Sequence, residues 1–243
     1  MADFIDLAQS HHSIRAFTDE PVGDADLRRA VEAGQAASTS GAIQSYCAIR
    51  ITDAAVRARL VELTGGQPYV ASAGAFLVIC GDTRRHRLVA RERGVPYAAR
   101  LEGFLLAVID ATLFAQNLVL AMESMGYGAC YIGGLRNSLP AVDRLLDLPA
   151  GVYPLYGVCL GRPAQAPLAR PRLDPRAVFF DDTYPDDAAM LDLVAEYDAR
   201  YERYLAERGA EPRSWSAVMA KKFREPRRAD LAAFYAEKGA DLS

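Results

Sequence analysis

The sequence predicts a mixed domain of helices and strands, and three observations support this prediction. The 243 residues are enough to bury a sizeable core without disulfides or metal. Apolar residues make up 51% and charged residues 24%, a globular balance that excludes a disordered chain. Helical and strand patterns alternate up to about residue 162. The net charge of −3 also argues against a general nucleic-acid binder.

The first third of the chain predicts three helices and one strand. A helix over residues 2–10 is followed by a polar turn, and residues 24–37 predict a second helix rich in alanine, leucine and arginine. Residues 48–52 alternate between apolar and polar side chains, as a strand does. Asp53 is the expected N-cap of a third helix, which reaches residue 63 and ends before two glycines.

The middle of the chain predicts three more strands and one long helix. Residues 75–80 are a continuous apolar run, typical of a fully buried strand. Residues 101–125 predict a helix that is apolar on nearly every side, which belongs at the centre of a domain or in a subunit interface. Its longest charge-free run, residues 111–122, falls short of the ~20 residues that cross a bilayer. Residues 127–134 and 152–161 predict the remaining strands.

The cysteines and the N-terminus indicate a reducing compartment. Cys47, Cys80, Cys130 and Cys159 are widely spaced without a C-x-x-C pair, so we expect structural thiols. The first residues lack both the basic start and the apolar core of a signal peptide. We therefore expect a cytoplasmic protein that does not bind a membrane.

Charge is distributed unevenly in the last third. Residues 174–198 hold eight acidic side chains and one arginine, whereas residues 200–228 hold nine Lys or Arg and four Glu. Such asymmetry is typical of a solvated helical tail. The alternative is an arm that packs on another subunit and brings positive charge to an anionic ligand.

Several common active-site motifs are absent. The G-x-G that begins at Gly126 is followed by Tyr131 where the dinucleotide-binding motif G-x-G-x-x-G requires its third glycine, so this motif is absent. The sequence also contains no P-loop and no G-x-S-x-G elbow. The adjacent His11 and His12 point in different directions on any regular element, so they make no metal pair. His86 lies in a basic stretch and is expected to be a solvated loop residue. Metal, P-loop and serine-hydrolase chemistry are therefore not predicted.

A scattered set of polar groups remains: Arg15, residues 38–41, Gln67, residues 131–136, and Arg170 with Arg172. A guanidinium can bind a phosphate with two parallel hydrogen bonds. The hydroxyls of residues 38–41 suit a sugar-like chain, and two glycines within 131–136 let backbone amides approach a flat ring. Each feature alone also fits a turn, a cap or a surface charge. Together they indicate a flat, phosphorylated ligand.

At these positions the sequence resembles the nitroreductase superfamily. The resemblance rests on residues 11–15, 18–21, 63–67, 115–117, 131–137 and 159–161. It is strongest to the branch of oxygen-insensitive NADPH nitroreductases and NADPH-flavin oxidoreductases. It implies an α+β, FMN-dependent nitroreductase-like fold with a central, mostly antiparallel sheet surrounded by helices. It also implies an intertwined homodimer, with an FMN-binding core over residues 1–165 and a C-terminal extension over 166–243 that packs on the partner subunit and the NADPH side. Core and extension are expected to form a single structural domain.

The resemblance also implies which residues bind the cofactors. The phosphate and ribityl end of non-covalent FMN is assigned to His11, His12, Ser13, Arg15, Arg170 and Arg172. Thr39 is assigned to the ribityl or ring side, and Gln67 and Tyr69 to the pyrimidine or ribityl portion. The backbone of Tyr131, Ile132, Gly133 and Gly134 is assigned to the isoalloxazine ring. Arg208 and Arg213 are assigned to the 2′-phosphate of NADPH. No catalytic side chain and no metal are expected, because the flavin performs the redox chemistry.

Three positions depart from the family pattern. His12 stands where arginine is usual, Arg170 stands where lysine is usual, and Gly41 with Ala42 replaces a bulkier pair, which suggests a more open pocket. None of these departures removes the implied reaction, in which NADPH reduces FMN and FMN then reduces a nitroaromatic, a quinone or a free flavin. Two alternatives stay open: a dedicated reductase that supplies reduced FMN to a partner oxygenase, and a non-catalytic flavin-binding protein. A basic arm suited to NADPH argues against the second.

Overall fold

The computed structural model describes residues 3–242, which form two compact units. The first unit contains the described residues up to Ala166 together with those from Arg228 onward, and Pro167–Arg227 forms the second unit. We expected residues 166–243 to form one extension. The last residues instead pack with the first unit, where Tyr235 donates a hydrogen bond from its hydroxyl to the Pro154 carbonyl at 2.9 Å.

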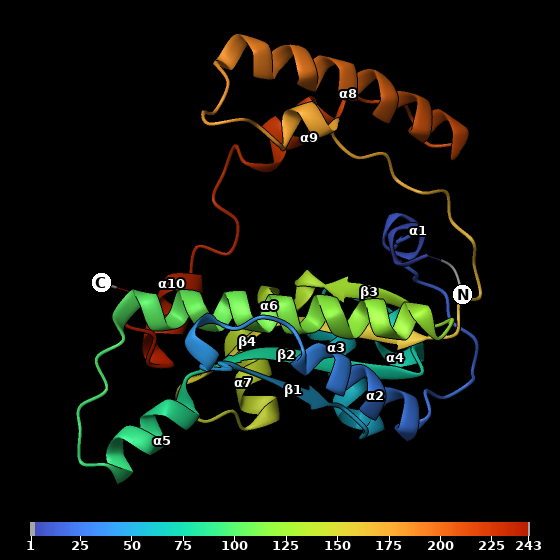
Figure 1. Cartoon of the computed structure of the whole chain (residues 1–243). Coiled ribbons are helices and arrows are strands. Elements are labelled where there is room, and N and C mark those ends of the chain that lie inside the picture. Colours follow the sequence, from blue (N-terminus) through green and yellow to red (C-terminus); the bar gives the residue numbers. More distant parts are fainter. Residues whose placement is uncertain (1–2, 243) are drawn as a thin grey trace. The chain divides into compact units, whose positions relative to one another are not determined.

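A four-stranded antiparallel sheet, counted over residues 3–242, lies at the centre of the first unit (Figure 1). Its strands are β1 (Tyr46–Arg50), β2 (Ala75–Asp82), β3 (Gly128–Ile132) and β4 (Val152–Gly161), in the order β1-β2-β4-β3. All three pairings are antiparallel, as the resemblance implied. Every residue of β2 is buried, which explains why its sequence is continuously apolar rather than alternating.

Helices cover both faces of this sheet. On one face, α2 (Asp24–Gln35) and α6 (Arg100–Ser124) pack around Phe114, Leu118 and Met122 (Figure 1). On the other face, α3 (Ala54–Leu63), α4 (Tyr69–Ser72) and α7 (Leu139–Leu146) surround Phe76 and Val78. The other helices of the unit are α1 (Phe4–Gln9), α5 (Arg84–Glu92) and α10 (Leu231–Glu237), with the 3-10 turns η1 (Ser40–Ala42) and η2 (Gly133–Asn137).

The long helix α6 is buried on one side only. In the described part of the chain it is the one helix that is long and apolar enough to cross a membrane. Ala107, Ala111 and Leu118 are fully buried in the first unit, so we interpret α6 as a core helix. Its other side exposes an apolar stripe whose members are spaced four positions apart: Leu101, Leu105, Ile109 and Leu113, which are 39–51% exposed.

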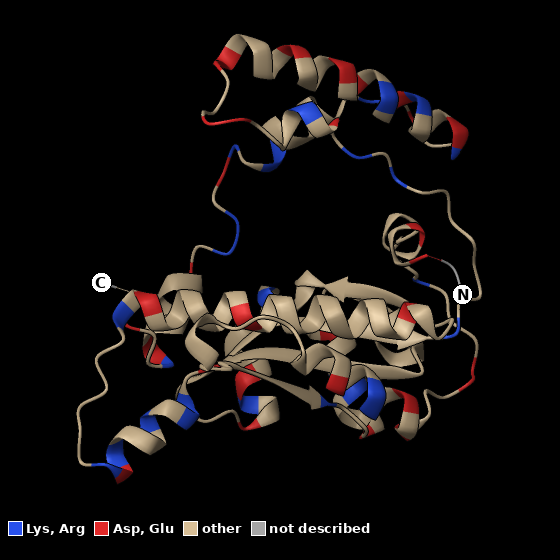
Figure 2. Cartoon of the chain, viewed as in Figure 1, with Lys and Arg blue, Asp and Glu red and all other residues tan. Residues whose placement is uncertain are grey.

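The second unit contains η3 (Pro175–Ala177), α8 (Asp187–Glu207) and α9 (Trp215–Lys222). The charged side chains in the first half of α8 are all acidic, and its second half also carries basic side chains (Figure 2). Tyr197 lies edge-on to Trp215 with ring centroids 5.5 Å apart, and Tyr201 and Tyr204 extend the same small core. Asp198 accepts the backbone N–H of Ser216 at 2.8 Å. The acidic and basic residues therefore belong to a helical unit with its own core.

Candidate functional site

The segment after α1 lies along β3. Ile14 donates its backbone N–H to the Ala129 carbonyl at 2.9 Å, and its side chain is 2% exposed. A Cβ atom at Gly128 would lie 2.5 Å from the Ile14 side chain, so only glycine allows this approach. Ser13 and Arg15 therefore flank a fixed, buried residue beside the sheet.

His11 and His12 have different environments. The Nδ1 atom of His11 lies 2.6 Å from Oε1 of Glu123, near the end of α6. His12 donates from Nδ1 to the Ser10 carbonyl at 2.7 Å, and both histidines line a cavity of about 160 Å³. Glu123 follows directly after the charge-free run of residues 111–122. Its contact with His11, 112 residues away in the chain, could not be found from local sequence.

Arg15 lies near the turn that contains Gln67 and Tyr69. Burial raises the pKa of Tyr69, although the positive charge of the nearby Arg15 lowers it in part. The Tyr69 hydroxyl donates to Oε1 of Gln67 at 2.5 Å, and Nε2 of Gln67 donates to the Thr64 carbonyl at 2.7 Å. Two of the predicted FMN residues, Gln67 and Tyr69, are thus hydrogen-bonded to each other, and Arg15 lies close to them.

The glycine-containing segment after β3 contacts this turn. A Cβ atom at Gly134 would lie 2.3 Å from the Thr64 carbonyl oxygen and 2.4 Å from Nε2 of Gln67. At Gly133 the nearest atom would be 3.4 Å away, on Arg136. Gly134 is therefore required for the backbone to reach the turn, and the structure brings both predicted segments together.

The side chains of Tyr131 and Ile132 pack against other parts of the first unit. The Ile132 side chain is 1% exposed and belongs to the core. The ring of Tyr131 packs against Tyr156 with centroids 5.4 Å apart, and its hydroxyl donates to Oε1 of Gln116 at 3.4 Å. Burial raises the pKa of Tyr131, so its hydroxyl stays protonated at neutral pH. These positions fit the predicted backbone contacts.

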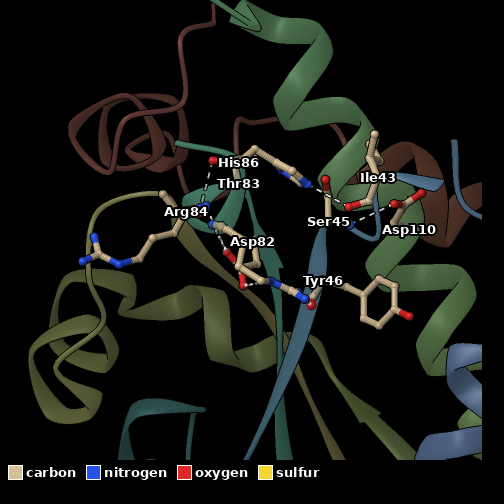
Figure 3. Close-up of polar contacts among 10 residues, drawn as sticks. Ile43, Ser45, Tyr46, Asp82, Thr83, Arg84, His86 and Asp110 are labelled. Atoms are coloured by element: carbon tan, nitrogen blue, oxygen red, sulfur yellow. Dashed lines mark hydrogen bonds and ion pairs between the residues drawn. The ribbon is translucent and has the colours of Figure 1, made fainter. Parts of the chain in front are cut away.

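The loop of Thr39 is held by a separate polar network (Figure 3). Asp110, on α6, accepts the backbone N–H of Ser45 at 3.0 Å and that of Ser40 at 3.3 Å. His86 points toward the same loop and donates from Nε2 to the Ile43 carbonyl at 2.7 Å. The expectation that His86 is a solvated loop residue is therefore wrong. It lies on α5 and is half-buried, because the predicted loop is a helix that packs on this segment.

Within one chain, the Thr39 loop and the His11 segment contact different parts of α6. The loop is bound at Asp110 and His11 is bound at Glu123. Thirteen residues separate these two positions, which corresponds to about 20 Å along a helix. The structure therefore does not bring Thr39 together with His11 in a single chain.

The other predicted cation positions lie in the second unit. Arg170 and Arg172 flank Pro171, whose carbonyl accepts the Tyr197 hydroxyl at 2.8 Å. Burial raises the pKa of Tyr197, and these two arginines lower it in part. Arg208 ends α8 and donates from Nη1 to the Tyr204 hydroxyl at 3.1 Å. Arg213 precedes Ser214, the N-cap of α9.

The donor set fits a phosphorylated flavin better than it fits a metal. Guanidinium, hydroxyl and amide groups and a glycine-dependent backbone approach all occur at the predicted positions. Over residues 3–242, no group of three or more His, Cys, Asp or Glu side chains is placed to hold a metal ion.

Comparison with known proteins gives the family. The nitroreductase family model matches residues 8–162, and the model of its C-terminal domain matches residues 170–243. The oxygen-insensitive NADPH nitroreductase of Salmonella typhimurium is 42% identical over 219 residues, 89% of each chain. The FMN reductase (NADPH) of Bacillus subtilis is 38% identical over 247 residues, 98% of each chain. The solved structure of NfrA1 nitroreductase from B. subtilis superposes with a TM-score of 0.94, at 37% identity and 98% coverage of both chains. The chain belongs to the nitroreductase family.

Proposed function

We propose that this protein is an FMN-dependent NADPH oxidoreductase that reduces nitroaromatics, quinones or flavins in two-electron ping-pong steps. The observation that supports this most directly is the hydrogen-bonded pair of Tyr69 and Gln67, which lies close to Gly134 and Arg15, at the positions assigned to FMN. The relatives point the same way, since they are named an NADPH nitroreductase and an NADPH-dependent FMN reductase.

Each residue of this group has a separate task toward FMN. Bound FMN supplies a ring that takes a hydride from NADPH and delivers two electrons to the acceptor. Arg15 binds the phosphate through charge-assisted hydrogen bonds, a role that the resemblance also gives to Arg170 and Arg172. Tyr69 stays protonated because burial raises its pKa, and its hydroxyl fixes the orientation of the Gln67 amide. The backbone amides of Gly133 and Gly134 favour negative charge on a bound ring.

Arg208 and Arg213 are proposed to select NADPH. The 2′-phosphate distinguishes NADPH from NADH and is a near-dianion that a guanidinium can bind with two hydrogen bonds. The contact of Arg208 with the Tyr204 hydroxyl and its position over the Tyr204 ring, 5.5 Å from the centroid, restrict its side chain. A restricted guanidinium loses less conformational entropy when it binds a phosphate.

The protein is also proposed to be a homodimer of the cytoplasm in which the partner subunit completes each site. The apolar stripe of α6 is 39–51% exposed in the described part of the chain and suits an isologous interface. A site at this interface would explain why Thr39 and His11 do not meet in one chain. Ile109→Lys should give monomers in analytical ultracentrifugation and weaken FMN binding. The control Leu88→Lys, at an exposed apolar position on α5, should leave the dimer intact.

A second candidate is a dedicated flavin reductase that supplies reduced FMN to a partner oxygenase. This candidate is supported by the alignment with the FMN reductase (NADPH) of B. subtilis, which covers 98% of each chain. Turnover of NADPH with free FMN, compared with turnover with a nitroaromatic, distinguishes the two. A kcat/KM at least tenfold higher for free FMN would favour the flavin reductase.

The test of the proposal as a whole is spectroscopic and kinetic. The purified protein should be yellow, show the absorption of bound flavin, and lose that colour when NADPH is added without oxygen. A nitroaromatic or quinone should then restore it. A preparation that stays colourless after incubation with FMN would overturn the proposal.

A further inference from the structure

The sheet contains two cysteine pairs in register. Cys47 on β1 lies opposite Cys80 on β2, and Cys130 on β3 lies opposite Cys159 on β4. All four are free thiols, and the proposed FMN chemistry uses none of them. Opposite residues of an antiparallel pair point to the same face of the sheet. Each pair is therefore a cross-strand dithiol.

The backbone spacing at Cys47 and Cys80 is compatible with a disulfide. Asp82 donates its N–H to the Ser45 carbonyl, and Ile51 donates its N–H to the Phe76 carbonyl. By alternation along the ladder, Cys47 and Cys80 form a hydrogen-bonded pair, whose Cα atoms lie about 5.5 Å apart. Disulfides join Cα atoms that are about 4.4–6.8 Å apart. A disulfide here needs no shift of register.

The two pairs differ in access. Cys47 is half-buried and lies on β1, an edge strand, whereas Cys80 beneath it is fully buried. Cys130 and Cys159 are 3% and 0% exposed. A dissolved oxidant can therefore reach Cys47 first, and Cys80 can react only through Cys47.

The electrostatic environments of the two pairs also make Cys47 the more reactive thiol. The adjacent Cys80 thiol lowers the pKa of Cys47, with support from Arg85, against burial and the nearby Asp82. Arg85 is held close by Asp82, which accepts from its Nε at 3.0 Å, and by the Tyr46 carbonyl. Burial raises the pKa of both Cys130 and Cys159. Since the thiolate is the reactive form, Cys47 is the more nucleophilic cysteine.

We propose that Cys47 and Cys80 form an oxidation site that reacts with hydrogen peroxide to give an intramolecular disulfide. The Cys47 thiolate attacks one peroxide oxygen, the O–O bond breaks, and the departing hydroxide takes up the proton that Cys47 released, giving water and a sulfenic acid. The Cys80 sulfur then attacks the Cys47 sulfur. The S–S bond forms, the S–O bond breaks, and the hydroxide leaves as a second water with the Cys80 proton. Two thiols lose two electrons, and the peroxide gains them.

The test uses the purified full-length protein, treated briefly with hydrogen peroxide, alkylated and digested without reductant. Two of the four thiols should be lost and should return with dithiothreitol, and mass spectrometry should find a peptide with Cys47 joined to one with Cys80. Cys47→Ser should lose no thiol under the same treatment. Cys80→Ser should stop at a sulfenic or sulfinic acid on Cys47. The double variant Cys130→Ser with Cys159→Ser is the matched control and should form the 47–80 link as the wild type does.

The peptide map of the wild-type protein decides the matter even if a serine variant fails to fold. Oxidation of Cys47 to its acids without any link to Cys80 would overturn the proposal. A link between Cys130 and Cys159, or four thiols that survive treatment, would overturn it equally. None of these results depends on bound FMN, so they leave the proposed oxidoreductase activity to its own test.

Discussion

The carboxylate of Asp110 accepts a hydrogen bond from the backbone N–H of Ser45, 65 residues earlier in the chain, at 3.0 Å. Asp110 is 1% exposed, and its second oxygen accepts the N–H of Ser40 at 3.3 Å. Between these two contacts Ala42 and Gln44 both have positive φ angles, of 58° and 51°. Such backbone costs of order 1–3 kcal/mol per residue and persists only where surrounding contacts impose it. Asp110 is therefore a main support of a strained loop.

Replacing this carboxylate should destabilise the protein. Asp110→Ala leaves the buried Ser45 N–H without a partner and should lower the free energy of unfolding by about 2–4 kcal/mol. Asp110→Asn keeps one acceptor oxygen and should cost less, because the Ser40 N–H is near solvent. Urea denaturation measures both. Asp24→Asn is the comparison, since its ion pair with Arg50 is at the surface. Equal effects of Asp110→Ala and Asp24→Asn would show that the loop does not depend on Asp110.

Gly134 and Gly133 offer a matched pair for the flavin side of the site. Gly134→Ala places a methyl group against the Thr64 carbonyl and should destabilise the protein by roughly 1–3 kcal/mol, while weakening FMN binding. Gly133→Ala meets no atom nearer than 3.4 Å and should fold with nearly unchanged stability. Thermal unfolding and fluorescence titration with FMN give the two quantities. The interpretation fails if both variants behave alike.

The sequence predicted the buried elements well and the charged helices poorly. The apolar runs at β2 and β4 and the long apolar α6 are visible in composition alone, since burial on both sides demands such residues. Helix α5 was missed because its basic sequence looks like a loop, although Asp82 accepts the Arg84 N–H at its start at 2.9 Å. The first strand was expected two residues too late, since its start is set by pairing with β2 rather than by local pattern.

Arg15→Ala should weaken FMN binding ten- to hundredfold. This follows from the loss of a charge-assisted hydrogen bond of roughly 1.5–3 kcal/mol, at 1.4 kcal/mol for each factor of ten. Riboflavin lacks the phosphate and should bind the variant and the wild type almost equally. Quenching of flavin fluorescence measures both dissociation constants. Equal losses for the two ligands would mean that Arg15 acts through Tyr69 and folding rather than through the phosphate.

Arg208→Ala should remove about 1.5–3 kcal/mol of transition-state stabilisation with NADPH, which appears as a lower kcat/KM. The kcat/KM with NADH should hardly change. Raised ionic strength should slow the NADPH reaction more than the NADH reaction. Steady-state kinetics with each dinucleotide checks this. Arg203→Ala, also on α8, is the control and should preserve the NADPH preference. An unchanged preference in Arg208→Ala would remove Arg208 from the NADPH site.

The candidate site was predictable where its residues are close in sequence. Gln67 and Tyr69 contact each other two positions apart, and residues 11–15 form one continuous segment outside the helices and strands. The supports of the site could not be predicted in this way. Asp110 reaches Ser40 across 70 residues and His86 reaches Ile43 across 43 residues. These contacts exist only after the sheet has formed, so one sequence gives no local signal for them.

The described residues from Arg228 onward belong to the first unit, so Pro167–Arg227, which contains most of the basic residues of 200–228, is joined to that unit at both ends. Lys238 is 8% exposed and donates to the Leu148 carbonyl at 2.5 Å, and Arg228 donates to Oδ1 of Asn137 at 2.7 Å. The segment Pro167–Arg227 is therefore an insertion tethered at both ends rather than a free tail. Such a loop has already lost part of its chain entropy by closure, so less remains to be lost when it binds a ligand. Cutting the chain at one end would release that constraint without removing a single arginine.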